Sequence, residues 1–155
     1  MIVVADTSPL CYLVLIGFID VLPQLYKQVF IPERVQLELS DSGAPDAVRA
    51  WITQPPGWLT ICSVEEPDDL QDLDPGERDA ISLAETLGAN LMILDDKPAR
   101  KIASQRKLNV IGLLGVLATA DQQGLIDFVA AIEALKRTSF RVSPRLLDDL
   151  VKRYR

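Results

Sequence analysis

The sequence starts with Met1-Ile-Val-Val-Ala-Asp6, and a later stretch, Leu91-Met-Ile-Leu-Asp95-Asp96, repeats its pattern of an apolar run that ends in aspartate. Such short runs of large aliphatic residues are typical of strands buried on both faces, as in a parallel sheet. A carboxylate is costly to bury where such a strand stops, so we expect other groups to compensate it. Sites in open α/β sheets form beyond the carboxyl ends of the strands. The two stretches therefore predict a shared carboxylate cluster, of the kind that divalent cations hold together.

Strand and helix signals alternate along the rest of the chain, which predicts an α/β fold. The expected strands end at residue 6 and cover residues 29–31, 59–64, 91–94 and 110–111. The expected helices cover residues 10–16, 19–26, 46–53, 75–87 and 98–107, with one more opened by Pro32 and mostly helical structure after residue 111. Thr7 or Ser8 is the expected cap of the first helix. Residues 65–74 form an acidic connection with room for one helical turn. With 155 residues and no repeat or linker, we expect one domain, residues 1–155.

The composition is that of an ordinary globular protein, with 48% hydrophobic and 25% charged residues. No apolar run reaches the ~18 residues that a membrane span needs. The apolar segment 10–18 lacks a basic leader, so we expect a cytoplasmic protein without a signal peptide. Cys11 and Cys62 are expected to be small core residues in a reducing compartment. The chain has no histidine, which excludes Ser-His-Asp triads and the usual zinc sites and leaves carboxylates as catalytic material.

The net charge of −6 argues against a nucleic-acid partner, but the distribution of the charges softens this inference. Residues 97–107, directly after Asp96, contain five basic side chains and no acidic one. Residues 136–155 form a second basic segment. The acids concentrate between residues 65 and 79, and a bound metal would cancel part of their charge. Each basic segment taken alone is equally well explained as a solvated helix face.

Helical spacing places further acids near the expected cluster. Glu38 lies three residues after Val35, so it shares the apolar face of its helix. The alternative is that Glu38 is an edge residue that reaches solvent. In the helix over residues 75–87, Glu77 aligns with the apolar stripe and Asp79 lies off its centre. Both are in the first turn, so capping and compensation of the helix dipole are the alternative explanation for this pair.

These acids are too many to lie together, poorly solvated, without cations: Asp6, Glu38, Glu77, Asp79, Asp95 and Asp96. A carboxylate cage that keeps some waters suits Mg²⁺ or Mn²⁺, which prefer oxygen ligands and dehydrate reluctantly. Such an ion activates a water and stabilises charge on a phosphoryl oxygen. The set therefore predicts phosphodiester hydrolysis without histidine and without a covalent intermediate.

Four motifs, in this order and spacing, resemble those of PIN-domain ribonucleases. They are Val4-Ala-Asp6-Thr-Ser8-Pro-Leu10, Ile31-Pro32-x-x-Val35-x-x-Glu38-Leu39, Gly76-Glu77-Arg78-Asp79-Ala80-Ile81 and Leu94-Asp95-Asp96-Lys97-x-x-Arg100. Each motif alone is weak, whereas four in sequence are fairly specific and extend over nearly the whole chain. The last two resemble especially a VapC-like branch of the family. The resemblance implies a three-layer α/β/α sandwich on a parallel sheet, with the acids at its carboxyl edge.

The resemblance also implies roles for the acids of the first three motifs. Asp6 would be the central metal ligand and Ser8 a supporting hydrogen-bond donor. Glu38 would be the second acid of the pattern and Asp79 the third, also a metal ligand. Glu77 is similar to the paired acids of the related flap nucleases. With Asp96 of the fourth motif, these four acids make up the expected catalytic set.

The fourth motif departs from the usual pattern of the family. Leu94 stands where those proteins normally have threonine, so both Asp95 and Asp96 are candidate metal ligands. Lys97 and Arg100 would contact RNA phosphates, or Arg100 would only neutralise the cluster.

The resemblance further implies Mg²⁺ or Mn²⁺, a homodimer and, for toxin members, an antitoxin whose tail occupies the active-site groove. We therefore expect an endoribonuclease that is the toxin of a type II toxin–antitoxin pair. One alternative is a catalytically weak PIN-like binding module that acts through protein partners. A phosphoacceptor receiver domain is a second alternative, but there the aspartate pair follows the first strand and the single aspartate a later one, the reverse of the order here.

Overall fold

The sheet at the centre of the molecule contains five parallel strands in the order β3-β2-β1-β4-β5. The computed structural model describes residues 1–65, 69–141 and 144–154. The strands are β1 (Val3–Ala5), β2 (Val29–Pro32), β3 (Leu59–Cys62), β4 (Leu91–Ile93) and β5 (Val110–Ile111). The chain builds outward from β1 to β3 on one side and from β4 to β5 on the other. The direction therefore switches between β1 and β4, where open sheets of this kind place their crevices.

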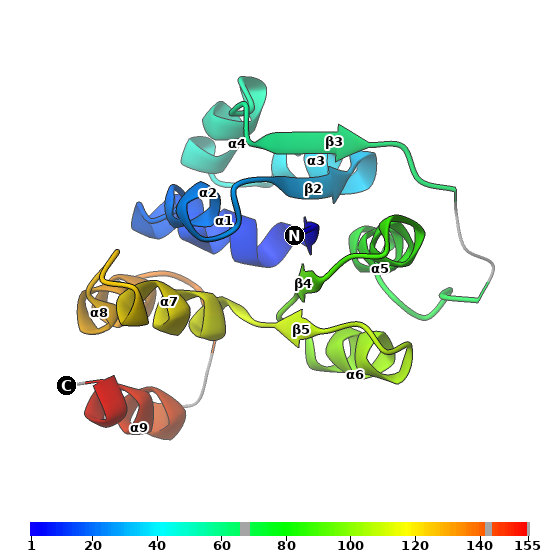
Figure 1. Ribbon diagram of the computed structural model, residues 1–155. Helices are drawn as coiled ribbons and strands as arrows, with labels where there is room; N and C mark the ends of the chain where they lie inside the picture. Colours follow the sequence, from blue (N-terminus) through cyan, green and yellow to red (C-terminus); the bar gives the residue numbers. More distant parts are fainter. Residues whose placement is uncertain (66–68, 142–143, 155) are drawn as a thin grey trace.

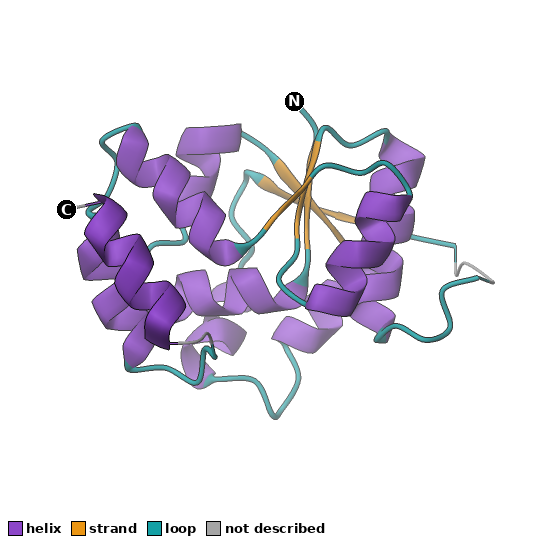
Figure 2. Cartoon of the chain, turned by 90° about the horizontal axis from the view of Figure 1, so that it is seen from below, coloured by secondary structure: helices purple, strands orange, loops and turns teal. Residues whose placement is uncertain are grey.

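Helices cover both faces of the sheet, so the predicted α/β/α architecture is confirmed (Figures 1 and 2). The helices are α1 (Thr7–Ile16), α2 (Val21–Tyr26), α3 (Glu33–Leu39), α4 (Asp46–Thr53), α5 (Pro75–Leu87), α6 (Lys97–Gln105), α7 (Leu113–Gln122), α8 (Phe128–Lys136) and α9 (Pro144–Tyr154). Figure 1 shows α5 and α6 on one side of the sheet, with α1, α2, α7 and α8 on the other. None of the helices in the described ranges is long and apolar enough to cross a membrane.

Alternate residues of the central strands supply two separate cores. Val3 and Ala5 of β1 pack with Ile93 of β4 under the layer that contains α1, α7 and α8. Val4 and Met92 point to the opposite side and pack under α5 and α6. All five side chains are fully buried, and each such aliphatic side chain contributes about 1.5–3 kcal/mol relative to an exposed one. Burial on both faces explains why these strands are continuous apolar runs without alternation.

The expected cap of the first helix was wrong. Neither Thr7 nor Ser8 precedes α1, because the helix already begins at Thr7 and Asp6 occupies the N-cap position with extended backbone angles (φ −90°, ψ 172°). The Thr7 hydroxyl donates instead to the carboxylate of Glu38 on α3. The Thr7 hydroxyl, which local capping rules would pair with an amide of its own helix, is therefore bound to a residue distant in sequence.

Other boundaries moved by one to three residues. β3 ends at Cys62, and β4 ends at Ile93. α6 begins at Lys97 because the side chain of Asp96 accepts a hydrogen bond from the Ala99 amide at 3.1 Å and so caps the helix one residue earlier than expected. In the acidic connection, residues 66–68 lie outside the described residues, and residues 69–74 form turns without a helical segment.

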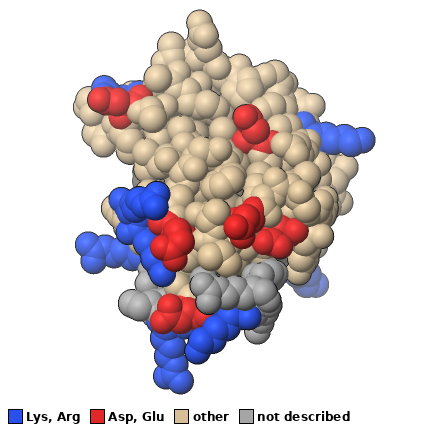
Figure 3. All heavy atoms as spheres, turned by 90° about the vertical axis from the view of Figure 1, so that its left-hand side faces the viewer, with Lys and Arg blue, Asp and Glu red and all other residues tan. Residues whose placement is uncertain are grey.

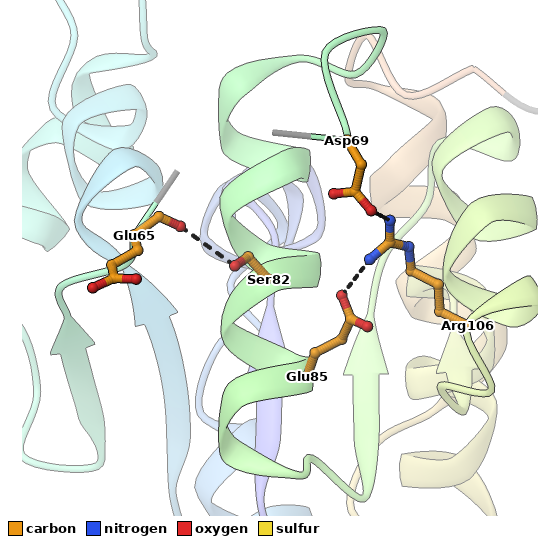
Figure 4. A network of polar contacts seen from close by, with 5 residues as sticks. All are labelled: Glu65, Asp69, Ser82, Glu85 and Arg106. Atoms are coloured by element: carbon orange, nitrogen blue, oxygen red, sulfur yellow. Dashed lines mark hydrogen bonds and ion pairs between the residues drawn. The ribbon is translucent and has the colours of Figure 1, made fainter. Parts of the chain in front are cut away.

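The acidic connection is fastened to α5 and α6 by a polar network (Figure 4). The Arg106 guanidinium donates to Glu85 at 2.6 Å and also to Asp69. The Ser82 hydroxyl donates to the main-chain carbonyl of Glu65 at 3.5 Å. These contacts join the connection before α5 to both helices of that layer.

Candidate active site

The two strand-end acids meet at the switch point of the sheet. The register of β1 and β4 pairs Ala5 with Ile93, and the Asp6 amide donates to the Ile93 carbonyl at 3.0 Å. Asp95 follows two residues after Ile93, and its charge acts directly on Asp6. The parallel register of the two strands therefore brings these carboxylates to one crevice.

Two hollows meet at Asp6, and together we call them the acid cleft. The first, of about 700 Å³, extends past Glu38, Asp74 and Glu77. The second, of about 570 Å³, extends past Glu77, Asp95 and Asp96. Both hollows have five wall residues in common: Asp6, Ser8, Tyr12, Glu77 and Ser139. Ser8 thus lies on the wall of both hollows, as a supporting hydroxyl would.

Asp6 is held in an environment that opposes its charge. It is only 5% exposed, and burial is the main cause that raises its pKa to about 7. The carboxylates of Glu38, Asp95 and Asp74 raise the pKa further, while the Thr7 backbone amide acts in the opposite direction. The Oδ1 atom of Asp6 is buried and has no hydrogen-bond partner within the described part of the chain.

Glu77 is half-buried, and the charges of Asp6 itself and of Asp74 act on it. Burial, followed by the charges of Asp6, Asp96 and Asp74, raises its pKa to about 7. These couplings join acids at the N-terminal ends of α1 and α5 and in the loop after β4 into one electrostatic group. Protons or a cation must neutralise part of this group near neutral pH.

The two aspartates after β4 have different local roles. Asp95 Oδ1 accepts a hydrogen bond from the Leu113 amide at 2.8 Å, at the start of α7. Burial raises the Asp95 pKa, whereas the Leu113 amide and the charge of Arg100 lower it, and its Oδ2 is buried without a partner in the described ranges. Asp96 uses one oxygen to cap α6. Both side chains line the second hollow.

Glu38 reaches the cleft because Gly76 has no side chain. A Cβ atom built at position 76 would lie 2.8 Å from the Glu38 carboxyl carbon and closer still to its oxygens. Thr7 holds the same carboxylate from the opposite direction. The glycine of the third motif therefore makes room for the acid of the second.

Asp79 differs from the other predicted acids. It is 8% exposed and forms an ion pair with the Nε atom of its neighbour Arg78 at 3.4 Å. Asp79 is not among the described residues that line either hollow of the acid cleft. The structure thus brings together five of the six predicted acids, and Asp79 lies outside this group.

Three cleft residues were missed by the sequence analysis. Asp74 precedes Pro75 at the start of α5, a typical N-cap arrangement that could have indicated its position. Tyr12 lies one helical turn after Ser8, on the same face of α1. Ser139 shares a hydrogen bond of 2.9 Å with the Tyr12 hydroxyl, and no local pattern indicates this contact across the fold.

Lys97 and Arg100, the predicted RNA contacts, line a separate hollow of about 350 Å³, which we call the basic hollow. Asp95 lies on the wall between the basic hollow and the acid cleft. The second basic segment includes α9, and Figure 3 shows Lys and Arg side chains gathered mostly toward that end of the molecule, mixed with acids. Basic side chains therefore lie beside the acid cleft despite the negative net charge.

The donors of the acid cleft suit a hard divalent cation. No three His, Cys, Asp or Glu side chains of the described residues already converge as a complete ligand set. However, Asp6 Oδ1 and Asp95 Oδ2 are buried oxygens without hydrogen-bond partners in the described ranges, and both residues line the second hollow. Carboxylate oxygens of this kind are the ligands that Mg²⁺ and Mn²⁺ prefer, so the residues present fit such an ion.

A family model described as a PIN domain matches residues 2–155. Among solved structures, a PilT N-terminus domain protein from the hyperthermophilic archaeon Sulfolobus solfataricus P2 superposes with a TM-score of 0.58. The two are 19% identical, and the match covers 77% of this chain and 93% of that one, which is a likeness of fold. A sequence comparison with curated proteins gave no match.

Proposed function

The chain belongs to the PIN-domain family, and from this premise we propose that it is a metal-dependent endoribonuclease that cleaves phosphodiester bonds of single-stranded RNA. PIN domains are typically metal-dependent nucleases. The observation that carries the proposal is the acid cleft, where Asp6 and Glu77 both have a pKa near 7 and no described cation neutralises Asp6.

In this proposal, Asp6 and Asp95 hold Mg²⁺ or Mn²⁺ through their unpartnered oxygens. Asp96 contributes its second carboxylate oxygen, because the first caps α6. The ion, when bound, supplies an activated water and stabilises negative charge on the scissile phosphate. Asp79, predicted as a further ligand, would have to leave its ion pair with Arg78 to take part.

The remaining cleft residues orient the substrate and accept protons. The Glu77 carboxylate borders both hollows, and its pKa near 7 suits a group that accepts a proton from the attacking water. Glu38 is fixed by Thr7 and adds negative charge beside Asp6, which strengthens the attraction for a cation. Ser8 donates a hydrogen bond from its hydroxyl to a carboxylate oxygen that holds the metal ion.

The finer biological role belongs to the same proposal. We place the chain as a cytoplasmic toxin of a type II toxin–antitoxin pair, active as a homodimer and inhibited by a small protein partner. Family membership supports this role. Where a small reading frame lies beside the gene, coexpression with its product should yield a stable complex in which cleavage is suppressed, and two proteins that purify separately would contradict the antitoxin assignment.

A cleavage assay on the purified chain tests the enzymatic part. Single-stranded RNA should be cut with Mg²⁺ or Mn²⁺ and should remain intact with EDTA, and Mn²⁺ binding measured by calorimetry should vanish in the Asp6→Asn variant. Cleavage that survives thorough chelation would exclude the proposed mechanism. RNA binding without cleavage in any divalent ion would instead favour the catalytically weak binding module.

A further inference from the structure

The basic hollow is formed by parts of the chain that are distant in sequence. Lys97 and Arg100 come from α6, and Arg141 comes from the segment after α8. Its floor is the start of α7, around Gly112 and Gly115. Arg141 is about forty residues away from the α6 cations in the sequence, and the fold places it on the same hollow.

The basic hollow and the acid cleft share part of their walls. Asp95, Phe140 and Arg141 line the basic hollow and also the second hollow of the acid cleft. Phe140 is fixed there by an edge-to-face contact with Tyr12, whose ring centroid lies 5.1 Å away. A chain that passes over this wall from the acid cleft enters the basic hollow directly.

The cations of the basic hollow outnumber the acid on its wall. Arg49 and Arg106 elsewhere in the molecule are engaged by carboxylates. Within the ranges that the structure describes, no ion pair joins Lys97, Arg100 or Arg141 to an acid. Asp95, the acid on the wall, directs Oδ1 to the Leu113 amide. The charge of Arg100 acts on Asp95 and lowers its pKa, and Lys97 and Arg141 give the hollow its surplus of positive charge.

The backbone at the floor is also suited to an anion. A Cβ atom at position 112 would lie 2.8 Å from Arg100 Nη1 and 2.9 Å from Asp95 Oδ1, so the glycine permits both side chains to approach the helix start. The first amides of a helix have no partner within it. The Leu113 amide donates a hydrogen bond to Asp95. The next two residues of that turn, Leu114 and Gly115, line the hollow. The positive end of α7 thus adds to the three cations.

We propose that the basic hollow binds one backbone phosphate of the RNA, the one adjacent to the phosphate at the acid cleft. This inference rests on the ribonuclease function proposed above and adds a defined subsite with Arg141 as a contact. Two arginines and a lysine suit the charge and fork geometry of a phosphodiester. The same chemistry would recognise free phosphate, so the experiment has to separate the two sources.

Binding without turnover tests the subsite independently of catalysis. The intact protein is titrated in EDTA with a fluorescent 2′-O-methyl RNA, which resists cleavage, and with variants of it in which one phosphate at a time is replaced by a neutral methylphosphonate. One position should weaken binding several-fold in the wild type. The Arg100→Gln/Arg141→Gln double variant should lose this position-specific effect, with a salt slope shallower by about 0.7 for the lost phosphate contact. Lys101→Gln, an exposed cation of α6 that does not line the hollow, serves as the matched control and should keep the effect.

Two results would overturn the subsite. The first is an unchanged position-specific effect in the double variant, which places that phosphate elsewhere. The second is saturable binding of inorganic phosphate at the Gly115 amide, followed by NMR, without any position-specific effect in the RNA series, which assigns the hollow to free phosphate. Absence of cleavage by a protein that still shows the double-variant effect would contradict the proposed catalysis and leave the subsite standing.

Discussion

Helix α5 carries a glutamate near each end, and the two have opposite surroundings. Glu85, near the last turn, accepts a hydrogen bond from Arg106, which also binds Asp69. Glu77, in the first turn, faces Asp6, Asp74 and Asp96, and its pKa rises to about 7. In the first group each carboxylate has the same cationic partner, and both acids are also exposed to solvent. The second holds like charges together, which costs folding free energy and is retained where a ligand can neutralise them.

The largest effect is expected from Asp6→Asn, which removes the charge at the centre of the acid cleft with little change in shape. Cleavage of single-stranded RNA should fall by about 100-fold or more, since even residues that only support metal ligands account for effects of 10- to 100-fold. Without metal, the melting temperature should stay level or rise because repulsion is relieved. Asp69→Asn, in the satisfied group around Arg106, is the matched control and should cleave normally. Unfolding of the Asp6→Asn variant would identify Asp6 as a structural residue.

The two groups should also differ in their response to pH. The pKa values of Asp6 and Glu77 rise from ordinary values of 3.8 and 4.5 to about 7 on folding. The folded protein therefore binds more protons than the unfolded chain between about pH 4 and pH 7, and its stability in EDTA should decrease as the pH rises through that window. Thermal melts across this range should show the decrease, and Asp6→Asn should reduce it. A melting temperature that increases steadily from pH 4.5 to pH 7.5 would contradict the raised pKa values of Asp6 and Glu77.

Gly76→Ala tests the space that admits Glu38 to the cleft. Alanine in a helix normally stabilises by about 0.5–1 kcal/mol relative to glycine. Here the new methyl group would collide with the Glu38 carboxylate, so we expect a loss of about 1–3 kcal/mol in the free energy of unfolding, together with weaker metal binding. Gly57→Ala is the control, because a Cβ atom there meets nothing within 4 Å. Equal stabilities of the two variants in urea titrations would show that Glu38 can move away at no cost.

The smallest effect is expected from Arg106→Gln in the satisfied group. Its partners are partly exposed, and ion pairs of this kind contribute about 0–1 kcal/mol each. Chemical unfolding should show a small loss that shrinks at high salt, and the cleavage rate should not change. A large loss of cleavage would mean that the connection before α5 positions Glu77 through this network.

The strand-end acids could be predicted because one rule fixes them: parallel strands end at the same edge, and Asp6 and Asp95 follow two neighbouring strands. The helix acids were harder. Spacing places Glu77 and Asp79 two residues apart, about 200° around α5, but only the tertiary placement of α5 decides which of them faces the cleft. The periodicity favoured Glu77 and the family resemblance favoured Asp79, and Glu77 is the one that lines both hollows.

The contribution of the segment after α8 could not be predicted. Ser139 and Phe140 carry no motif, and both contact Tyr12, which is more than a hundred residues earlier in the chain. Arg141 counted in the sequence only as one cation of the second basic segment, without a place beside the cleft. Contacts of this range depend on how α8 packs against α1, which no local pattern encodes. The same limit explains the cap of α1, where Glu38 takes the Thr7 hydroxyl.

The strand order has a consequence for synthesis of the protein. β1 is made before its neighbour on the side of the acid cleft, β4, which begins only at Leu91, so the wall that carries Asp95 cannot form until β4 has been synthesised. Pairing across such a long loop is also slow, because the closure entropy must be overcome before any contact forms. A ribonuclease of the kind proposed above is synthesised on an RNA template within a machine made largely of RNA. The late synthesis of β4 keeps the acid cleft incomplete until the first three strands and helices α1 to α5 have been made.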